Sequence, residues 1–306
     1  MAVGLRIHDS ELAELLIGEP YLRYSESSIP TLAKSEIWSA PTATEWVRRL
    51  KRQNEPGGDS RNIEKTVDRS AKTSSLTAYV MLEGITSSII EHRALGSLGG
   101  QTSQILESLI RVHSQHLRSE ENNESDVFSL LALWHCAFVS LFADINRIEL
   151  AVGREGFDES QKHTEYVREW AKSADGSRCA LHATRVLQNV ENLAIGVEPA
   201  IHVPRLVYRS ALIWYAYTKY GKDDPSAPQM NLDFPELFKA GFNGRMLLFE
   251  ANGFKLTRPA TEESSTLCCL VDLLKRVGHW GISRRMSSLM MLLVHGSSPE
   301  LEKNAL

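Results

Sequence analysis

Four charged residues that lie close together in the sequence are the first candidates for a functional site. Asp144 and Arg147 are three residues apart in an apolar helical pattern, and Glu149 and Arg154 flank the end of that pattern. Charges that point into a helical core need partners that offset their desolvation. We interpret the four residues either as a structural ion-pair network or as a polar pocket that recognises a small effector. The sequence leaves both interpretations open.

Two pairs of residues have the helical spacing of half a metal site. Cys179 and His182 are three residues apart, and so are His113 and His116. A structural zinc site needs closely spaced ligand pairs such as Cys-x2-Cys. The cysteines of this chain stand at positions 136, 179, 268 and 269 and lack that spacing. We therefore expect no metal site and no cofactor, and we interpret Cys179 as a thiol of the core.

Catalytic signatures are weak throughout the chain. Adjacent aspartates can hold magnesium in all-α enzymes that ionise diphosphates, but the one such pair, Asp223 and Asp224, falls in an expected loop. Nucleophile elbows, His-Glu-x-x-His helices, phosphate loops and dinucleotide fingerprints are all missing from the sequence. We therefore expect no catalytic residues. The alternative is an all-α enzyme of small-molecule metabolism with a polar site near Asp144, Arg147 and Glu149.

Helices are the elements that would position these residues. A composition of 42% hydrophobic and 24% charged residues is typical of globular proteins and excludes a fibrous or wholly disordered chain. Apolar residues recur with the 3.6-residue period of helices, and the two-residue period of strands is nearly absent. Near the start, Ser10 is expected to cap a short helix whose apolar face holds Leu12, Leu15 and Leu16. Further helices are expected at 76–90, 105–117, 126–151, 166–171, 179–193, 204–220, 235–250, 267–277 and 282–294.

The pattern divides the chain into three parts. Residues 1–75 form an N-terminal segment with short helices and a flexible linker, because residues 53–74 contain few large apolar side chains. Residues 76–296 form a single large all-α domain that is built like a helical bundle, and residues 297–306 form a C-terminal tail. The stretch 126–151 is apolar on nearly all sides, so we expect it to be the central helix.

A basic cluster ends the second short helix of the N-terminal segment. Thr42 and Glu45 have the spacing of a capping box at the start of that helix. The cluster consists of Arg48, Arg49, Lys51 and Arg52. It fits either a nuclear-import signal or the solvated end of a helix, where basic residues favour the helix dipole.

Charge and hydropathy limit the partners of the chain. A net charge of −4 lacks the basic footprint of a DNA-binding domain, so we expect the chain alone to bind DNA poorly. Its first residues carry charges such as Arg6 and Asp9 where a secretory signal would be apolar, which predicts an intracellular protein. The apolar run 127–143 is too short, at ~1.5 Å per residue, to cross a ~30 Å hydrocarbon core, and we expect no membrane partner.

A series of short segments begins in the expected central helix. It comprises Leu133-Trp134-His135, Leu141-Phe142-Ala143-Asp144, Glu149, Gly153-Arg154-Glu155-Gly156, Trp170-Ala171, Arg178-Cys179-Ala180-Leu181-His182-Ala183, Glu198-Pro199-Ala200-Ile201-His202-Val203-Pro204 and Gly278-His279-Trp280-Gly281. In order and spacing these segments resemble the fungal-specific transcription factor domain over residues 75–295. That domain is the large helical regulatory region C-terminal to the DNA-binding domain of fungal zinc-cluster and zinc-finger activators. The likeness is closest to versions attached to paired C2H2-type fingers.

The resemblance implies a nuclear regulator of transcription by RNA polymerase II, often of metabolic or secondary-metabolite genes. It implies other transcription proteins or a second copy of the chain as partners, and it allows a small-molecule effector. The zinc ligands of the family cannot be carried over, because residues 1–75 contain no cysteine and His8 is their one histidine. Contact with DNA is therefore expected only through a zinc-finger module that this chain does not contain.

Overall fold

The protein is helical wherever its structure is defined. A computed structural model describes residues 2–16, 18–23, 40–54, 75–117, 126, 128–191, 193, 198–221, 232–247, 271–277 and 281–295. The regular structure within these ranges contains helices and no strand, which confirms the predicted all-α class. The predicted aspartate pair at 223–224 and the tail at 297–306 lie outside the described residues.

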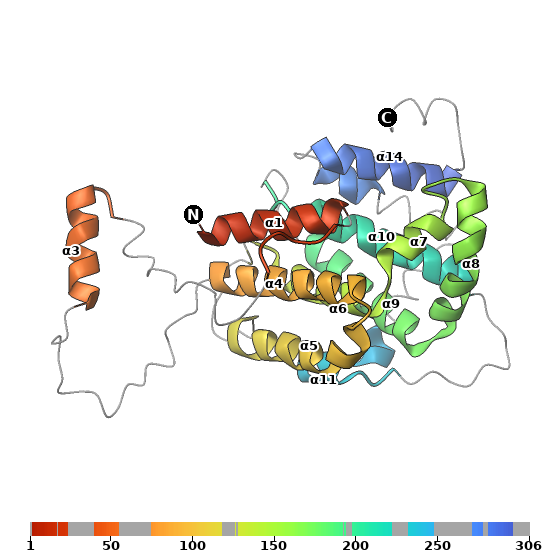
Figure 1. Cartoon of the computed structure of the whole chain (residues 1–306), viewed down its shortest axis with the longest axis horizontal. Helices are drawn as coiled ribbons and strands as arrows, with labels where there is room; N and C mark the ends of the chain where they lie inside the picture. Colours follow the sequence, from red (N-terminus) through yellow and green to blue (C-terminus); the bar gives the residue numbers. More distant parts are fainter. Residues whose placement is uncertain are drawn as a thin grey trace.

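The helices follow one another with short connections through most of the chain. In order they are α1 (Ala2–Leu16), α3 (Ala43–Asn54), α4 (Ser75–Ala94), α5 (Leu98–Val112), the π-helical turn η2 (His113–Leu117), α6 (Leu130–Phe142), α7 (Ile145–Ala151), α8 (Phe157–Lys172), α9 (Ala174–Glu191), α10 (Val203–Tyr220), α11 (Pro235–Lys239) and α14 (Gly281–His295). Residues 244–247 and 271–276 are also helical. Figure 1 shows α1, α4 and α5 lying one above another on one side of the molecule.

Helix α6 forms the centre of the core, as its apolar sequence predicts. Eleven of its residues are buried, and it packs against α4, α9 and α10. The carboxylate of Asp126 accepts backbone N–H bonds from Leu130 and Leu131, at 2.8 and 3.1 Å, and so caps the start of α6. The pair α4 and α5 packs together across a short turn in which Gly96 has a φ of +68°, a conformation that glycine adopts without strain.

The prediction of one continuous helix over residues 126–151 is wrong. Helix α6 ends at Phe142, Ala143 is extended, and α7 leaves at 74° to α6. Asp144 causes the new start, because its side chain accepts the backbone N–H of Arg147 at 3.1 Å and thereby caps α7. The backbone N–H of Asp144 itself donates to Tyr166 Oη at 3.2 Å, so this group has a partner outside the helix at the break.

Helix α1 differs from the prediction in where it starts and in which side chains it buries. Ser10 lies inside the helix rather than at its start, and it bonds Ser87 of α4 at 2.6 Å between the two hydroxyl oxygens. Leu12 and Leu16 are exposed, at 56% and 75%, whereas Glu11 and Glu14 are buried. The buried face combines Val3 and Ile7 with these two carboxylates, and Leu15 is partly buried against the core. Apolar periodicity could not place the carboxylates, because their charged partners lie on another helix.

Smaller differences concern the ends of helices. Helix α8 begins at Phe157 rather than near residue 166, because its first turns are polar and carry no apolar period. Helix α11 stops at Lys239 instead of running toward residue 250, since Gly241 turns the chain with a φ of +83°. Helix α10 agrees closely with its prediction, with Pro204 in its first turn.

Among the described residues, no single helix is both long and apolar enough to cross a membrane; the bent pair α6 and α7 reaches that length and composition only when its two parts are counted together.

Trp134 offers a direct test of the central position of α6. Its side chain is 1% exposed, and its indole N–H donates to the carbonyl oxygen of Leu109 at 2.8 Å. We expect Trp134→Ala to lower the free energy of unfolding by about 3 to 5 kcal/mol, the usual cost of deleting a buried aromatic side chain. Urea unfolding measures this loss. Trp46→Ala in α3, where the ring is 42% exposed, is the matched control. A loss below about 1 kcal/mol at Trp134 would contradict the assignment.

Candidate functional site

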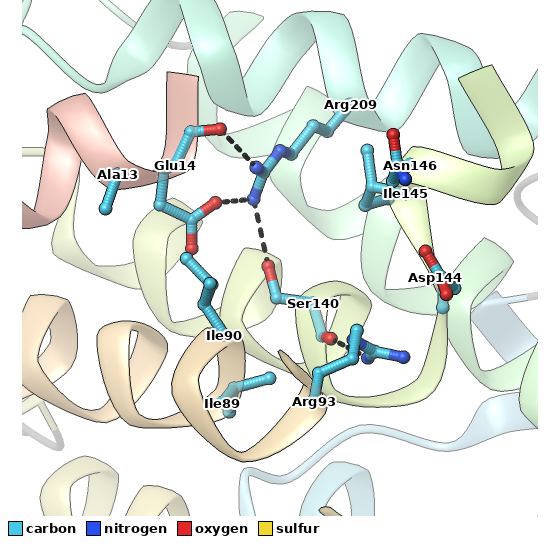
Figure 2. A pocket seen from close by; sticks show the side chains of 11 residues that line it. Ala13, Glu14, Ile89, Ile90, Arg93, Ser140, Asp144, Ile145, Asn146 and Arg209 are labelled. Atoms are coloured by element: carbon cyan, nitrogen blue, oxygen red, sulfur yellow. Dashed lines mark hydrogen bonds and ion pairs between the residues drawn. The ribbon is translucent and has the colours of Figure 1, made fainter. Parts of the chain in front are cut away.

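An open hollow lies where five helices meet. It has a volume of about 450 Å³, solvent included, and lies between α1, α4, the junction of α6 with α7, and α10. The side chains in Figure 2 show its walls. The lining residues are Ala13, Glu14, Ile89, Ile90, Arg93, Ser140, Ala143, Asp144, Ile145, Asn146 and Arg209. We call this hollow the cleft.

Arg93 of α4 joins the cleft to the end of α6. Its Nη2 donates to the carbonyl oxygens of Ser140 and Leu141, at 2.6 and 3.2 Å. The last carbonyls of a helix have no partner within the helix, so this contact satisfies two of them. The guanidinium is thereby fixed in place at the edge of the cleft, and its charge is not paired with a carboxylate among the described residues.

Arg209 of α10 forms the opposite wall together with Glu14 of α1. The two side chains form an ion pair, and Arg209 also donates to the backbone oxygen of Glu14 at 3.0 Å. A third bond runs from Arg209 to the hydroxyl of Ser140 at 3.1 Å. Figure 2 shows these contacts crossing from α1 to α6. The wall is therefore rigid, and its charges compensate each other.

The four charged residues that the sequence singles out do not converge on one place. Asp144 lines the cleft. Arg147 turns away, with its guanidinium carbon 3.8 Å from the centre of the Tyr166 ring. Glu149 and Arg154 pair with each other at 2.6 Å at the far end of α7. The four residues thus divide into one cleft residue, one ring contact and one ion pair.

Arg154, which pairs with Glu149, also contacts a residue that lines the cleft. Its Nη2 donates to Asn146 Oδ1 at 2.7 Å, and Asn146 lines the cleft beside Asp144. The same guanidinium contacts Glu155 at 3.2 Å. Arg154 therefore orients the amide of Asn146, whose nitrogen has no hydrogen-bond partner among the described residues.

A buried ion network next to the cleft was missed by the sequence reasoning. Arg205 of α10 is 2% exposed and forms an ion pair with Glu11 of α1, with a second bond from Nε to Oε2 at 3.1 Å. The same guanidinium lies 3.4 Å from Glu14 and 3.5 Å from Glu83 of α4. The signal in the sequence was the pair of arginines, Arg205 and Arg209, four residues apart in an otherwise apolar helix.

The network shifts the pKa values of two neighbouring carboxyl groups in opposite directions. Burial alone would raise the pKa of Glu11, but the charge of Arg205 outweighs burial and lowers that pKa to about 2. Burial and the negative charge of Glu11 raise the pKa of Glu83 well above its usual value. The raised pKa favours the protonated form of Glu83, for which Glu11 is a hydrogen-bond partner.

Within the described part of the chain, one group of residues has the composition and closeness of a metal site. One possible ligand atom from each of Glu11, Glu83 and His202 lies within 4.8 Å of the other two. Arg205 already contacts both carboxylates, however, and its positive charge would repel a cation there. The Nδ1 atom of His202 is also committed to Tyr79 Oη, at 2.6 Å. The geometry fits an internal ion network better than a metal centre.

The predicted pair of Cys179 and His182 does not act together. Cys179 is a fully buried thiol near the carbonyl oxygen of Val139, and burial raises its pKa well above the usual value. His182 instead contacts His135, with 2.9 Å between their Nδ1 atoms, and lies 3.5 Å from a carboxylate oxygen of Glu236. Burial lowers the pKa of both histidines, so the pair is neutral and links α6, α9 and α11.

The second pair with half-site spacing, His113 and His116, for which we expected no metal, lies in η2. The His113 ring is 4.6 Å, centre to centre, from the ring of Trp134. Within the described ranges, no third ligand completes a metal group with either histidine.

The basic cluster lies on α3. The start of that helix is capped as predicted, with the backbone N–H of Glu45 donating to Thr42 Oγ1 at 3.2 Å. Arg48 and Arg49 pair with the Glu45 carboxylate at 2.6 and 2.8 Å. The other two basic residues of the cluster, Lys51 and Arg52, are exposed.

Comparisons of the chain with models of known families, with curated proteins and with solved structures give no match. The fold and the cleft thus define an all-α protein with a small charged and apolar cleft beside a buried ion network, and its function has to be argued from these features.

Arg205 should be the residue on which the attachment of α1 depends most. We expect Arg205→Met to lower the free energy of unfolding by about 3 to 5 kcal/mol, because it leaves buried carboxylates without a cation. Arg168→Met is the control, since Arg168 pairs with Glu165 on the surface at 3.5 Å, and it should cost less than about 1 kcal/mol. Chemical denaturation of both variants provides the comparison. Equal losses would show that the network does not stabilise the fold.

His202 predicts a pH dependence of stability. Burial lowers its pKa from 6.5 to about 4. Between these values the unfolded chain binds a proton that the folded protein does not bind, so stability falls as the pH decreases from 6.5 to 4. The slope contributed by His202 is up to about 1.4 kcal/mol per pH unit. We expect a shallower slope for His202→Gln and an unchanged slope for the exposed control His8→Gln, as measured by urea unfolding at a series of pH values. A His202→Gln slope equal to that of the natural sequence would contradict the assignment.

Proposed function

We propose that the chain is a helical regulatory domain of a nuclear transcription regulator, of the kind that fungal zinc-cluster and zinc-finger activators carry. The resemblance of its segments to that domain suggests this function, and the all-α fold is compatible with it. The basic cluster of α3 supports a nuclear location, because Lys51 and Arg52 are exposed for recognition. Secondary-metabolite or other metabolic genes are the targets that the resemblance suggests.

The observation that carries the proposal is the position of the cleft. Its walls come from α1, α4, the junction of α6 with α7, and α10, which are far apart in the sequence. A small molecule in the cleft would therefore bias the packing of α1 against the rest of the domain. An effector can shift a protein between states only through contacts that differ between those states. A ligand held between a terminal helix and the core meets that condition.

The alternative of an all-α enzyme receives less support from the geometry. Its site would require Asp144, Arg147 and Glu149 to converge on one substrate. Asp144 lines the cleft, but Arg147 stacks on Tyr166 and Glu149 pairs with Arg154. General acid–base catalysis requires groups within hydrogen-bonding reach of the same reacting atoms. The cleft alone therefore favours ligand recognition over turnover.

A reporter assay tests the proposal. The whole chain is fused to an unrelated DNA-binding domain and directed to a promoter that drives a reporter gene. We expect reporter output to differ from that of the DNA-binding domain alone. The same fusion carrying Arg205→Met, in which α1 is loosened, should lose most of that difference. Output equal to that of the DNA-binding domain alone, with the fusion folded and present in nuclei, would contradict the proposal.

A further inference from the structure

Two opposite charges line the cleft without pairing with each other. Arg93 and Asp144 both belong to its walls, and no ion pair within 4.0 Å joins them. Figure 2 draws both side chains at the cleft with no contact between them. Opposite charges that lie in one hollow and leave each other unpaired can each accept an oppositely charged group of a ligand. The cleft therefore offers one cationic and one anionic subsite.

Each of the two residues is held in place by part of its polar atoms only. Arg93 uses Nη2 for the carbonyl oxygens at the end of α6. Asp144 uses Oδ1 for the backbone N–H of Arg147. Within the described chain, no hydrogen bond or ion pair engages Arg93 Nη1 or Asp144 Oδ2. Both groups are thus pre-organised by one set of bonds and keep further capacity for a ligand, which lowers the entropy cost of binding.

The remaining charges of the cleft are already compensated. Glu14 and Arg209 pair with each other, and Glu14 also lies 3.4 Å from Arg205. A ligand that displaced these contacts would leave a buried charge unpaired, at a large cost. Arg93 and Asp144 are therefore the charged groups of the cleft that a ligand can engage without such a cost.

The rest of the lining is suited to an aliphatic group. Ala13, Ile89, Ile90, Ala143 and Ile145 form the apolar part of the walls. Small-molecule sites typically combine such apolar surface with a few polar groups that fix the orientation of the ligand. The amide nitrogen of Asn146, whose oxygen is engaged by Arg154, adds one uncharged donor.

We propose that the cleft binds a small aliphatic zwitterion, of the class of the free α-amino acids, with its carboxylate on Arg93 and its ammonium group on Asp144. The aliphatic side chain lies against the isoleucine and alanine surface, next to α1. This inference rests on the proposed function for its regulatory meaning, because it names the class of effector. The binding itself does not depend on a role in transcription.

Calorimetric titration of the whole chain at neutral pH tests the proposal. The probes are four aliphatic amino acids (L-alanine, L-valine, L-leucine and L-methionine), together with isoamylamine and isocaproate, which are leucine without its carboxylate and without its amine. We expect at least one amino acid to bind, with the two leucine fragments at least about tenfold weaker than leucine when leucine is the ligand found. Absence of binding by all four amino acids at about 10 mM would overturn the proposal.

Two variants assign the subsites. Asp144→Asn keeps a residue that caps α7 well, so the fold is preserved while the negative charge is lost. It should weaken leucine binding about tenfold and leave isocaproate binding unchanged. Arg93→Gln should weaken leucine binding similarly and leave isoamylamine binding unchanged. The controls Asp158→Asn and Arg168→Gln remove exposed charges on α8, outside the cleft, and should change neither.

The outcomes separate the two proposals. Unchanged leucine affinity in Asp144→Asn would overturn the zwitterion site, because that variant retains the cap, and circular dichroism verifies its fold. Leucine binding that requires Asp144 and Arg93, combined with a silent reporter fusion, would support the site and refute the transcription role. A responsive reporter with no amino acid bound would support the transcription role and refute the zwitterion site.

Discussion

The structure depends most on the ion network that joins α1 to α10. Glu11 and Glu14 lie on the inner face of α1, and Arg205 and Arg209 of α10 meet them in the interior. Buried charges are costly unless each one is paired and hydrogen-bonded. The pairing therefore ties the inner face of α1, which also buries Val3 and Ile7, to α10, and it builds one wall of the cleft. The raised pKa of Glu83 reduces the negative charge that three carboxyl groups place beside two guanidinium groups.

The break between α6 and α7 is the second feature on which the cleft depends. A straight helix would carry Asp144 onward along the axis of α6, whereas the 74° turn places it beside the end of α6 that Arg93 caps. Asp144 and Arg93 thus have structural duties at the same junction where they line the cleft. The binding of a ligand that engages both would consequently depend on the geometry of that junction.

The sequence predicts the helices better than it predicts the site. Apolar periodicity correctly indicates α4, α6 and α10, because packing of large apolar side chains determines their faces. It misleads at α1, where Glu11 and Glu14 are buried while Leu12 and Leu16 are exposed. It also fails at Ala143, where a capping side chain interrupts an apolar run. The candidate residues Asp144 and Arg154 were found because they are charged residues next to that run. Arg93, Arg205 and Glu11 could not be assigned, because their partners lie on helices that only the fold brings together.

The long sequence separation between α1 and α10 has a consequence for the order in which contacts form. Glu11 is 194 residues away from Arg205, so the ribosome releases α1 long before its partner exists. Until then the carboxylates of α1 lack their guanidinium partners. Contacts so distant in sequence close slowly, since they carry a large loop-closure entropy. Helix α1 can therefore pack on α4 early in synthesis, whereas its ion pairs with α10 close late.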